Sequence, residues 1–161
     1  ADYMTEKLWK PMGAEAEARR ILDQPGDAGR EVAAGGLVIR LRDYARFGYL
    51  AAHDGMVGGR QVLPKGWIAL ATQPQRPQVQ YGKLGDGPLG YGYQWWLIPG
   101  ADRAFTGEGI YGQFLMVNPQ LDLVVVKTSA WTAAWDDPMA LETFAMFEAL
   151  GASLRAQSQA Q

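Results

Sequence analysis

Three glycines interrupt a stretch of the sequence that otherwise has the composition of a β-strand. The stretch AFTGEGIYGQFLMVNP, residues 104–119, contains Gly107, Gly109 and Gly112. A glycine inside a strand often marks a bend, or a place where the backbone comes close to a ligand. In the second case, a neighbouring main-chain N–H can donate to a negatively charged oxygen about 3 Å away. The glycines alone leave two interpretations open, a bend in a sheet or the wall of an active site.

Composition excludes several other kinds of site. The 161 residues include no Cys and a single histidine, His53, so thiolate and His-based metal sites are not expected, and no organic cofactor is implied. The net charge of −2 gives no electrostatic footprint for nucleic acid or an anionic membrane. No apolar run is long enough to span a membrane. The many aromatic residues (six Trp, seven Tyr and five Phe) predict a large core or a lined pocket.

The first half of the chain has the pattern of helices joined by loops. Residues 2–10 predict the end of an amphipathic helix, and residues 14–30 a surface excursion. A longer helix is expected from about Leu41 to Gly55, with Asp43 in its first turn, where a negative charge suits the helix dipole. A short helix should begin at Pro64 and end near Ala71, followed by a loop over residues 73–88.

The second half has the pattern of an antiparallel sheet closed by a helix. Strands are expected over residues 91–98, 112–117 and 121–129, with Asn-Pro-Gln as the turn between the last two. Asp137 should cap a final helix that has Pro138 at its first position. Its inward face is predicted to carry Ala140, Phe144, Phe147, Leu150 and Leu154. The fold class is therefore α+β, a three-stranded antiparallel meander with helices before it and a C-terminal helix packed on the sheet.

The sequence divides into a helical part with its connecting loops (residues 1–88), a sheet with its closing helix (89–154) and a tail expected to fray (155–161). Three strands and one helix leave a sheet edge that needs cover. The chain begins at Ala1, directly in a helical pattern, without the charged and apolar regions of a signal peptide. We therefore expect further chain or a partner to cover that edge, and the compartment stays open between cytoplasm and periplasm.

Five segments, in this order, resemble the C-terminal part of the serine β-lactamase-related hydrolases. They are EKLWKPMG (residues 6–13), AAGGLVIRLRDYARFGYL (33–50), GGRQVLPKGWI (58–68), LGYGYQWWLIPG (89–100) and GEGIYGQFLMVNPQLDLVVVKTS (107–129). That superfamily, with its β-lactamase/transpeptidase-like fold, includes class C β-lactamases, DD-peptidases, esterases and 6-aminohexanoate-dimer hydrolases. The pairing of YGYQWW with GIYGQ is most similar to the last group. The resemblance covers almost the whole chain, although each motif alone is weak.

The resemblance implies a serine nucleophile in a Ser-x-x-Lys motif, followed by a Tyr-x-Asn or similar motif that handles the proton. Neither motif occurs here. Three residues after Ser129, Ser153 and Ser158 stand Thr132, Ala156 and Gln161, and two residues before Asn118 stands Met116. Both motifs precede this part of the chain in the family's order, so we expect a missing N-terminal part of the protein, or a second chain, to carry the nucleophile.

The same resemblance gives the glycine-rich strand a catalytic role. Gly107-Glu108-Gly109 stands where many family members have Lys-Thr-Gly or His-x-Gly. The absence of a cation there argues against β-lactamase activity. By resemblance, the backbone N–H of Ile110 is half of the oxyanion hole, and Gly109 lets the backbone approach the substrate without a Cβ in the way.

The resemblance implies further pocket residues. Trp96 corresponds to a wall of the family's cleft, although packing in the core is an equal alternative. Glu108 and Tyr111 flank the same strand, and Val38 and Ile39 follow a glycine loop that the family places near the pocket. Lys127-Thr128-Ser129 nearly matches Lys-Thr-Gly, but it lies one hairpin away and is interpreted as a strand exit.

The resemblance therefore implies part of a serine hydrolase that cleaves a small-molecule ester or amide, such as a 6-aminohexanoate oligomer or a β-lactam-like bond, through an acyl-serine. Without the nucleophile, the 161-residue chain is expected to be inactive. The alternatives are a non-catalytic binding or structural module of the same fold, and one chain of a two-chain hydrolase.

Overall fold

A computed structural model of the chain describes residues 2–32 and 35–160. Residues 1, 33, 34 and 161 lie outside the described part, so the segment expected to resemble the family over residues 33–50 is described from Gly35 onward. Within the described residues, no helix is long and apolar enough to cross a membrane.

An antiparallel sheet forms the centre of the molecule, which confirms the α+β class and the meander. It has five strands in sequence order, where the sequence predicts three: β5 (Gly90–Tyr91), β6 (Trp96–Leu97), β7 (Phe105–Gly109), β8 (Gln113–Asn118) and β9 (Leu123–Lys127). The predicted strand over residues 91–98 is in fact two short strands. The chain reverses between them, with Gln94 in the left-handed region (φ 65°) and Tyr91 opposite Trp96.

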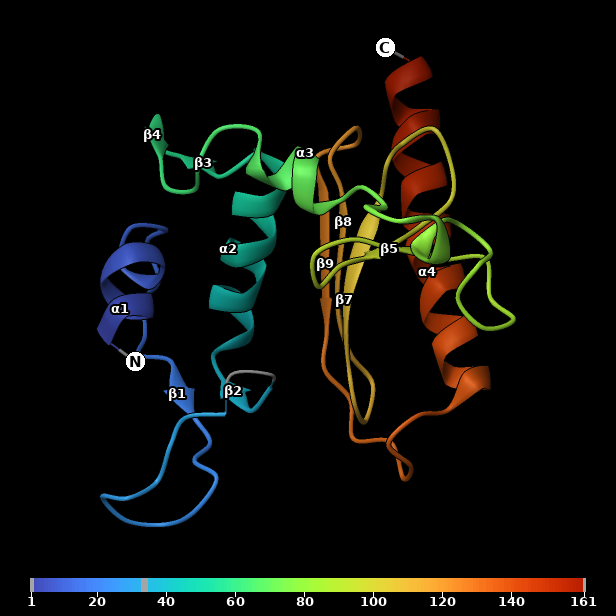
Figure 1. The fold of residues 1–161 in the computed structure, drawn as a ribbon. Coiled ribbons are helices and arrows are strands. Elements are labelled where there is room, and N and C mark those ends of the chain that lie inside the picture. The colour runs from blue at the N-terminus through green and yellow to red at the C-terminus, as the bar shows by residue number, and fades with distance from the viewer. Residues whose placement is uncertain (1, 33–34, 161) are drawn as a thin grey trace.

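Helices cover the two faces of this sheet. Figure 1 shows α2 (Leu41–Ala52) on one side of the long strands and α4 (Asp137–Gln159) on the other. Gly48 allows α2 to lie close to the sheet, because a Cβ at this position would stand 2.5 Å from Val124 and 2.6 Å from Leu115. Under α2 the buried core comprises Ala51, Ile68, Ala71, Trp95, Leu97, Phe105, Leu115 and Val117. Under α4 it comprises Ala104, Phe114, Met116, Trp131, Ala140 and Phe147.

The closing helix begins one residue earlier than predicted, and its buried face agrees with the prediction in part. Asp136, and not Asp137, is the N-cap, and its side chain accepts a hydrogen bond from the Met139 amide at 3.0 Å. The residues that α4 buries are Ala140, Thr143, Phe147 and Gly151, while Leu150 is exposed. Ala140 and Phe147 were predicted for this face, and Phe144 packs against the same core, whereas Thr143 and Gly151 were not predicted. The helix continues past Arg155 to Gln159.

Shorter elements surround these layers. The chain opens with α1 (Asp2–Met4), which continues as the π-helical turn η1 (Thr5–Trp9). Two small antiparallel ribbons follow, β1 (Arg19–Arg20) with β2 (Leu37–Val38) and, after α2, β3 (Met56–Val57) with β4 (Arg60–Gln61). The helix α3 (Trp67–Ala71) matches the predicted short helix, and the loop after it contains the 3-10 turn η2 (Pro77–Val79).

Candidate active site

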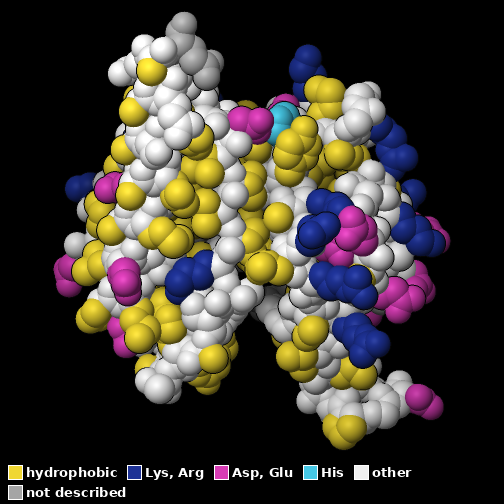
Figure 2. Space-filling model, turned by 180° about the vertical axis from the view of Figure 1, so that it is seen from behind, with side chains coloured by type: hydrophobic (Ala, Val, Ile, Leu, Met, Phe, Trp, Pro, Cys, Tyr) yellow, Lys and Arg dark blue, Asp and Glu magenta, His cyan; other side chains and the backbone are white. Residues whose placement is uncertain are grey.

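A hollow of about 460 Å³ lies between the segment that leads into α2 and the glycine-rich end of β7. Figure 2 shows the molecule deeply notched at its lower edge, between two lobes. The residues that line this hollow are Gly36, Leu37, Val38, Ile39, Leu41, Tyr44, Gly109, Gln113 and Thr128. No charged side chain is among them, and burial raises the pKa of Tyr44 above its ordinary value. The hollow is therefore suited to a neutral, largely apolar group.

The strand β7 has an open edge beside this hollow. Its neighbour β6 pairs with it only at Phe105 and Thr106, whereas β8 pairs with it along its whole length. The Ile98 amide donates to the Ala104 carbonyl, so the main-chain groups of Ala104 point toward β6. Because these groups alternate along a strand, those of Thr106 and Glu108 point the same way, and those of Gly107 and Gly109 point toward β8. The N–H of Ile110 belongs to the peptide whose carbonyl is that of Gly109, so it points away from β8, to the open edge.

Hydrogen bonds to a neighbouring loop hold the turn after Gly109. The Tyr111 amide donates to the Ala134 carbonyl at 2.9 Å, and the Tyr111 carbonyl accepts from the Trp131 amide at 3.3 Å. The side chain of Gln113 donates to the carbonyls of Tyr111 and Ser129. Tyr111 has a φ of 61°, a conformation that costs an aromatic residue energy and persists only where the surroundings enforce it. The direction of the Ile110 amide is therefore fixed by the packing of this turn.

Gly112 lies in the same turn and packs against Trp131. Its φ is 81°, and a Cβ would stand 2.3 Å from the indole of Trp131. Trp131 in turn packs against Phe114 and Trp135, and the Lys127 ammonium lies 5.0 Å from the centre of its ring. The turn thus rests directly on an aromatic cluster, and only glycine fits at this position.

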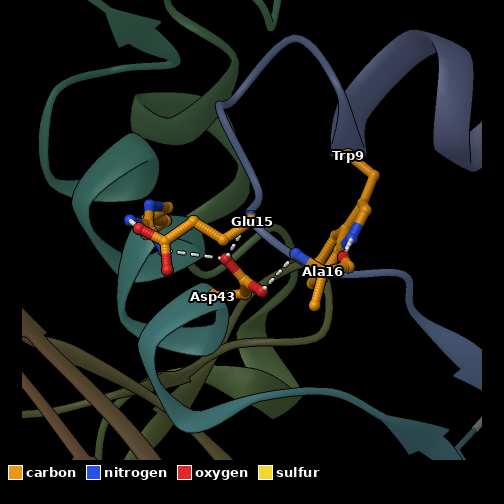
Figure 3. Close-up of polar contacts among 5 residues, drawn as sticks. Trp9, Glu15, Ala16 and Asp43 are labelled. Atoms are coloured by element: carbon orange, nitrogen blue, oxygen red, sulfur yellow. Dashed lines mark hydrogen bonds and ion pairs between the residues drawn. The ribbon is translucent and has the colours of Figure 1, made fainter.

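A buried carboxylate anchors the segment on the other side of the hollow. Asp43, in the first turn of α2, is fully buried and accepts hydrogen bonds from the amides of Glu15 and Ala16 and from Arg46 (Figure 3). Burial alone would raise its pKa, but these hydrogen bonds outweigh burial and hold the pKa of Asp43 below its usual value. Glu15 also pairs with Arg46. Asp43 thus ties the chain before β1 to the helix that follows β2.

Comparison with known proteins identifies this arrangement. The family model described as Beta-lactamase matches residues 1–143. The chain belongs to the β-lactamase family. A curated 6-aminohexanoate-dimer hydrolase from Paenarthrobacter ureafaciens is 33% identical over 133 residues, which is 81% of this chain and 33% of the relative. The chain therefore spans about a third of the length of that relative.

Solved structures agree with this assignment to the β-lactamase family. A protein from Bacillus anthracis, assigned to the 6-aminohexanoate-dimer hydrolases, superposes with a TM-score of 0.80 and 25% identity, over 96% of this chain and 38% of its own. A β-lactamase from Mycobacterium bovis gives a TM-score of 0.60 at 23% identity, covering 84% of this chain and 49% of its own. The second likeness shows the fold alone.

Four of the residues predicted for the site lie at the hollow or on its rim. Val38, Ile39 and Gly109 line it, and Ile110 follows Gly109 on the turn, where its side chain is 64% exposed. Tyr111 lies in the same turn, with a half-exposed side chain. Six further lining residues were not predicted for the site: Gly36, Leu37, Leu41, Tyr44, Gln113 and Thr128. The helical pattern placed Leu41 and Tyr44 on one face of α2, and Thr128 belongs to the segment interpreted as a strand exit.

Two of the predicted site residues, Trp96 and Glu108, lie on the face of the sheet that α4 covers. Trp96 is opposite Thr106, and Glu108 is opposite Phe114, which belongs to the core under α4. Trp96 lines a separate apolar groove beneath α4, whereas Trp95 packs under α2 against Phe47 and Phe105. The structure therefore does not bring Trp96 and the Glu108 side chain together with Val38 and Gly109.

The Glu108 carboxyl group on the α4 face is partly buried. Its Oε1 atom is buried and has no hydrogen-bond partner among the described residues, and burial raises the pKa of Glu108 to about 7. Nearby, Lys127 donates to the Ser129 hydroxyl at 2.6 Å. Lys127 shares the α4 face with Phe114, its cross-strand partner, and β9 ends at Lys127, so Thr128 and Ser129 follow the strand.

In residues 2–32 and 35–160 no cluster of His, Cys, Asp or Glu could hold a metal ion.

Proposed function

We propose that this chain forms the oxyanion-hole and pocket side of an acyl-serine hydrolase that cleaves an ester or amide, and that the chain alone is inactive. The open edge of β7 carries this proposal. It leaves the Ile110 N–H directed away from β8, next to a neutral hollow, on a turn that is held in place by the 129–134 segment. A donor fixed in advance in this way stabilises the charge that develops on a carbonyl oxygen without any reorganisation of the site.

Inactivity follows from the residues that are absent from the sequence. A carbonyl held at Ile110 needs a nucleophile with an adjacent base, and no Ser-x-x-Lys occurs in the 161 residues. We propose that residues N-terminal to Ala1 in the same protein, or a second chain, supply it. The substrate class is that of small esters and amides, because the relatives include a 6-aminohexanoate-dimer hydrolase and the family's basic position is occupied here by Gly107.

A chimera tests this function directly. The C-terminal part of the Paenarthrobacter ureafaciens hydrolase is replaced by this chain, and turnover of p-nitrophenyl esters is measured beside labelling of the serine by a fluorophosphonate. We expect turnover by the chimera and none by the 161-residue chain. Ile110→Pro removes the N–H at a residue whose φ is not positive, and it should lower kcat by about 10²–10³.

The matched control is Ile110→Val, which keeps the amide and should retain turnover within about twofold, since it removes one exposed methylene group. Thermal unfolding of both variants verifies folding. Equal turnover by the folded proline and valine variants would exclude an oxyanion role for Ile110. Turnover by the pure 161-residue chain would show that it carries a nucleophile of its own, and Ser129→Ala, which removes the hydroxyl beside Lys127, would then show whether Ser129 is that nucleophile.

A further inference from the structure

Two arginines, Arg19 and Arg40, lie at a short ribbon on the rim of the hollow that Gly109 also lines. Arg19 of β1 pairs with Val38 of β2, and directly opposite residues of antiparallel strands share a face. Arg40 follows Val38 by two residues, and it lines the same hollow as Arg19 and Val38. We call Arg19, Val38 and Arg40 the arginine rim.

The arginine rim borders a second hollow, of about 480 Å³, which shares two residues with the first. Its lining residues are Glu15, Ala16, Glu17, Arg19, Val38, Ile39 and Arg40. Val38 and Ile39 also line the hollow beside Gly109. Val38 is 57% exposed, so an apolar surface connects the two hollows. Figure 2 shows Lys and Arg side chains gathered on the lobe to the right of the notch.

The charges of the second hollow leave a positive excess. The Glu15 carboxylate is occupied by Arg46. None of the ion pairs formed within residues 2–32 and 35–160 involves Arg19, Arg40 or Glu17. Two guanidinium groups therefore face one unpaired carboxylate. Guanidinium groups bind carboxylates through two parallel hydrogen bonds, which makes arginine the preferred residue for this anion.

The first hollow has no charge of its own for an ionic substrate. Its lining is neutral, and the strand that bears the oxyanion turn carries Gly107 where a cation would stand in many relatives. Glu108, the one charged residue of that strand, has its side chain on the opposite face of the sheet. The adjoining second hollow does have charged lining residues near Val38, and these include Arg19 and Arg40.

We propose that the arginine rim binds the carboxylate end of a linear acyl substrate, with the methylene chain of the substrate lying across Val38 and its reacting carbonyl at Ile110. The carbonyl end of this arrangement rests on the proposed function. The carboxylate end does not, because binding there requires no nucleophile. The substrate class is thus an ester or amide whose acyl chain ends in a carboxylate.

Binding of hexanoate to the ¹⁵N-labelled 161-residue chain tests the carboxylate end. Two-dimensional NMR follows the Val38 amide and the Nε–H signals of Arg19 and Arg40, with hexanol and hexylammonium as ligands of the same chain length. We expect saturable shifts with hexanoate only, and a loss of about tenfold in affinity in each of Arg19→Gln and Arg40→Gln, because each removes a charged hydrogen-bond partner. Added salt should weaken binding, since the rim is exposed.

Arg76→Gln is the matched control, because Arg76 is an exposed arginine of the 72–89 loop outside both hollows. It should bind hexanoate as the unmodified chain does. Equal affinity of the rim variants and the control, or tighter binding of hexylammonium than of hexanoate, would overturn the proposal. The chimera separates the two proposals: hexanoate binding without ester turnover would retain the rim and reject the hydrolase function, and turnover without hexanoate binding would do the reverse.

Discussion

The two faces of the sheet differ in how completely their side chains fill space. Under α4, Phe114 and Met116 are fully buried, and a row of aromatic rings extends from Phe114 through Trp131 to Trp135. Toward the same end of the sheet, the α2 face carries Gly107 and Gly109 in place of side chains and borders the open hollow. One face is packed to hold the hairpin, and the other is left unfilled where the proposed function needs access to a backbone amide.

The same comparison separates the glycines of one hairpin by role. Gly112 points at Trp131 on the packed side and could not be replaced without moving it, whereas a Cβ on Gly107 would find ordinary contact distances of 3.6 Å to Trp95 and 4.0 Å to Tyr44. Glycines that look alike in the sequence therefore have different surroundings, tightly packed at Gly112 and loosely packed at Gly107. Substitutions on the two faces should therefore have different costs.

The packed face should be the more sensitive to loss of volume. Phe114→Ala removes a fully buried ring that touches Trp131, Trp135 and Phe144, and it should lower the free energy of unfolding by about 3–5 kcal/mol. Leu141→Ala on α4, where the side chain is 70% exposed, should change it by less than about 0.5 kcal/mol. Urea denaturation measures both, and a cost for Phe114→Ala near that of Leu141→Ala would show that the aromatic cluster is not packed as described.

The two hairpin glycines should respond differently to alanine. Gly112→Ala places a methyl group against Trp131 at a positive φ, and we expect a loss of about 2–4 kcal/mol. Gly107→Ala meets no close contact and should cost less than about 1 kcal/mol. The same denaturation experiment ranks them, and equal costs would mean that Trp131 does not clamp the turn.

Protonation of Asp43 in acid should destabilise the α2 side of the fold. The pKa of Asp43 is held below its ordinary value of 3.8, so its carboxylate stabilises the fold above about pH 4, and this stability is lost as the pH falls below that value. Asp43→Asn should lower the free energy of unfolding at pH 7 by about 2 kcal/mol and should flatten the acid limb of the stability curve. Thermal midpoints from pH 2 to 7 test this. An unchanged acid limb in the variant would assign the acid sensitivity to other carboxylates.

Glu108 should have the opposite pH dependence and a smaller effect. Its pKa is raised to about 7, so between pH 4.5 and 7 the folded protein keeps a proton that the unfolded chain releases. Stability should therefore decrease as the pH rises through this window and level off above it. Glu108→Gln, which cannot ionise, should remove the decrease and give a higher thermal midpoint at pH 8. A variant that is less stable than the unmodified chain at pH 8 would show that the ionised carboxylate is accommodated.

Much of the fold could be predicted because local signals and tertiary packing agree. Helix α2 has an apolar face, α4 begins at an Asp-Asp-Pro sequence, and β8 and β9 are apolar runs separated by Asn118-Pro119-Gln120. Other features depend on contacts that the sequence does not display. The reversal between Tyr91 and Trp96 puts Gln94 at a positive φ within an aromatic run, and Leu150 of α4 is exposed although it follows the apolar pattern.

The candidate site shows the same division. Gly109 drew attention because glycine in a strand is unusual, and Ile110, Val38 and Ile39 were named from the resemblance to the family. The face on which Trp96 and Glu108 lie depends on strand register, which a single sequence fixes poorly when both faces are buried. Asp43 was expected to act on the helix dipole, and its contacts with the amides of Glu15 and Ala16 arise only when distant segments meet.

The proposed function depends most on the direction of the Ile110 amide. Hydrogen exchange measured by NMR on the 161-residue chain tests this direction. Gly107 and Gly109, whose amides point toward β8, should be protected. Glu108 and Ile110, whose amides point to the open edge, should exchange about 100-fold faster than those glycines. Protection of Ile110 equal to that of Gly107 would mean that its N–H already has a partner within the sheet, and the proposed oxyanion hole would be contradicted.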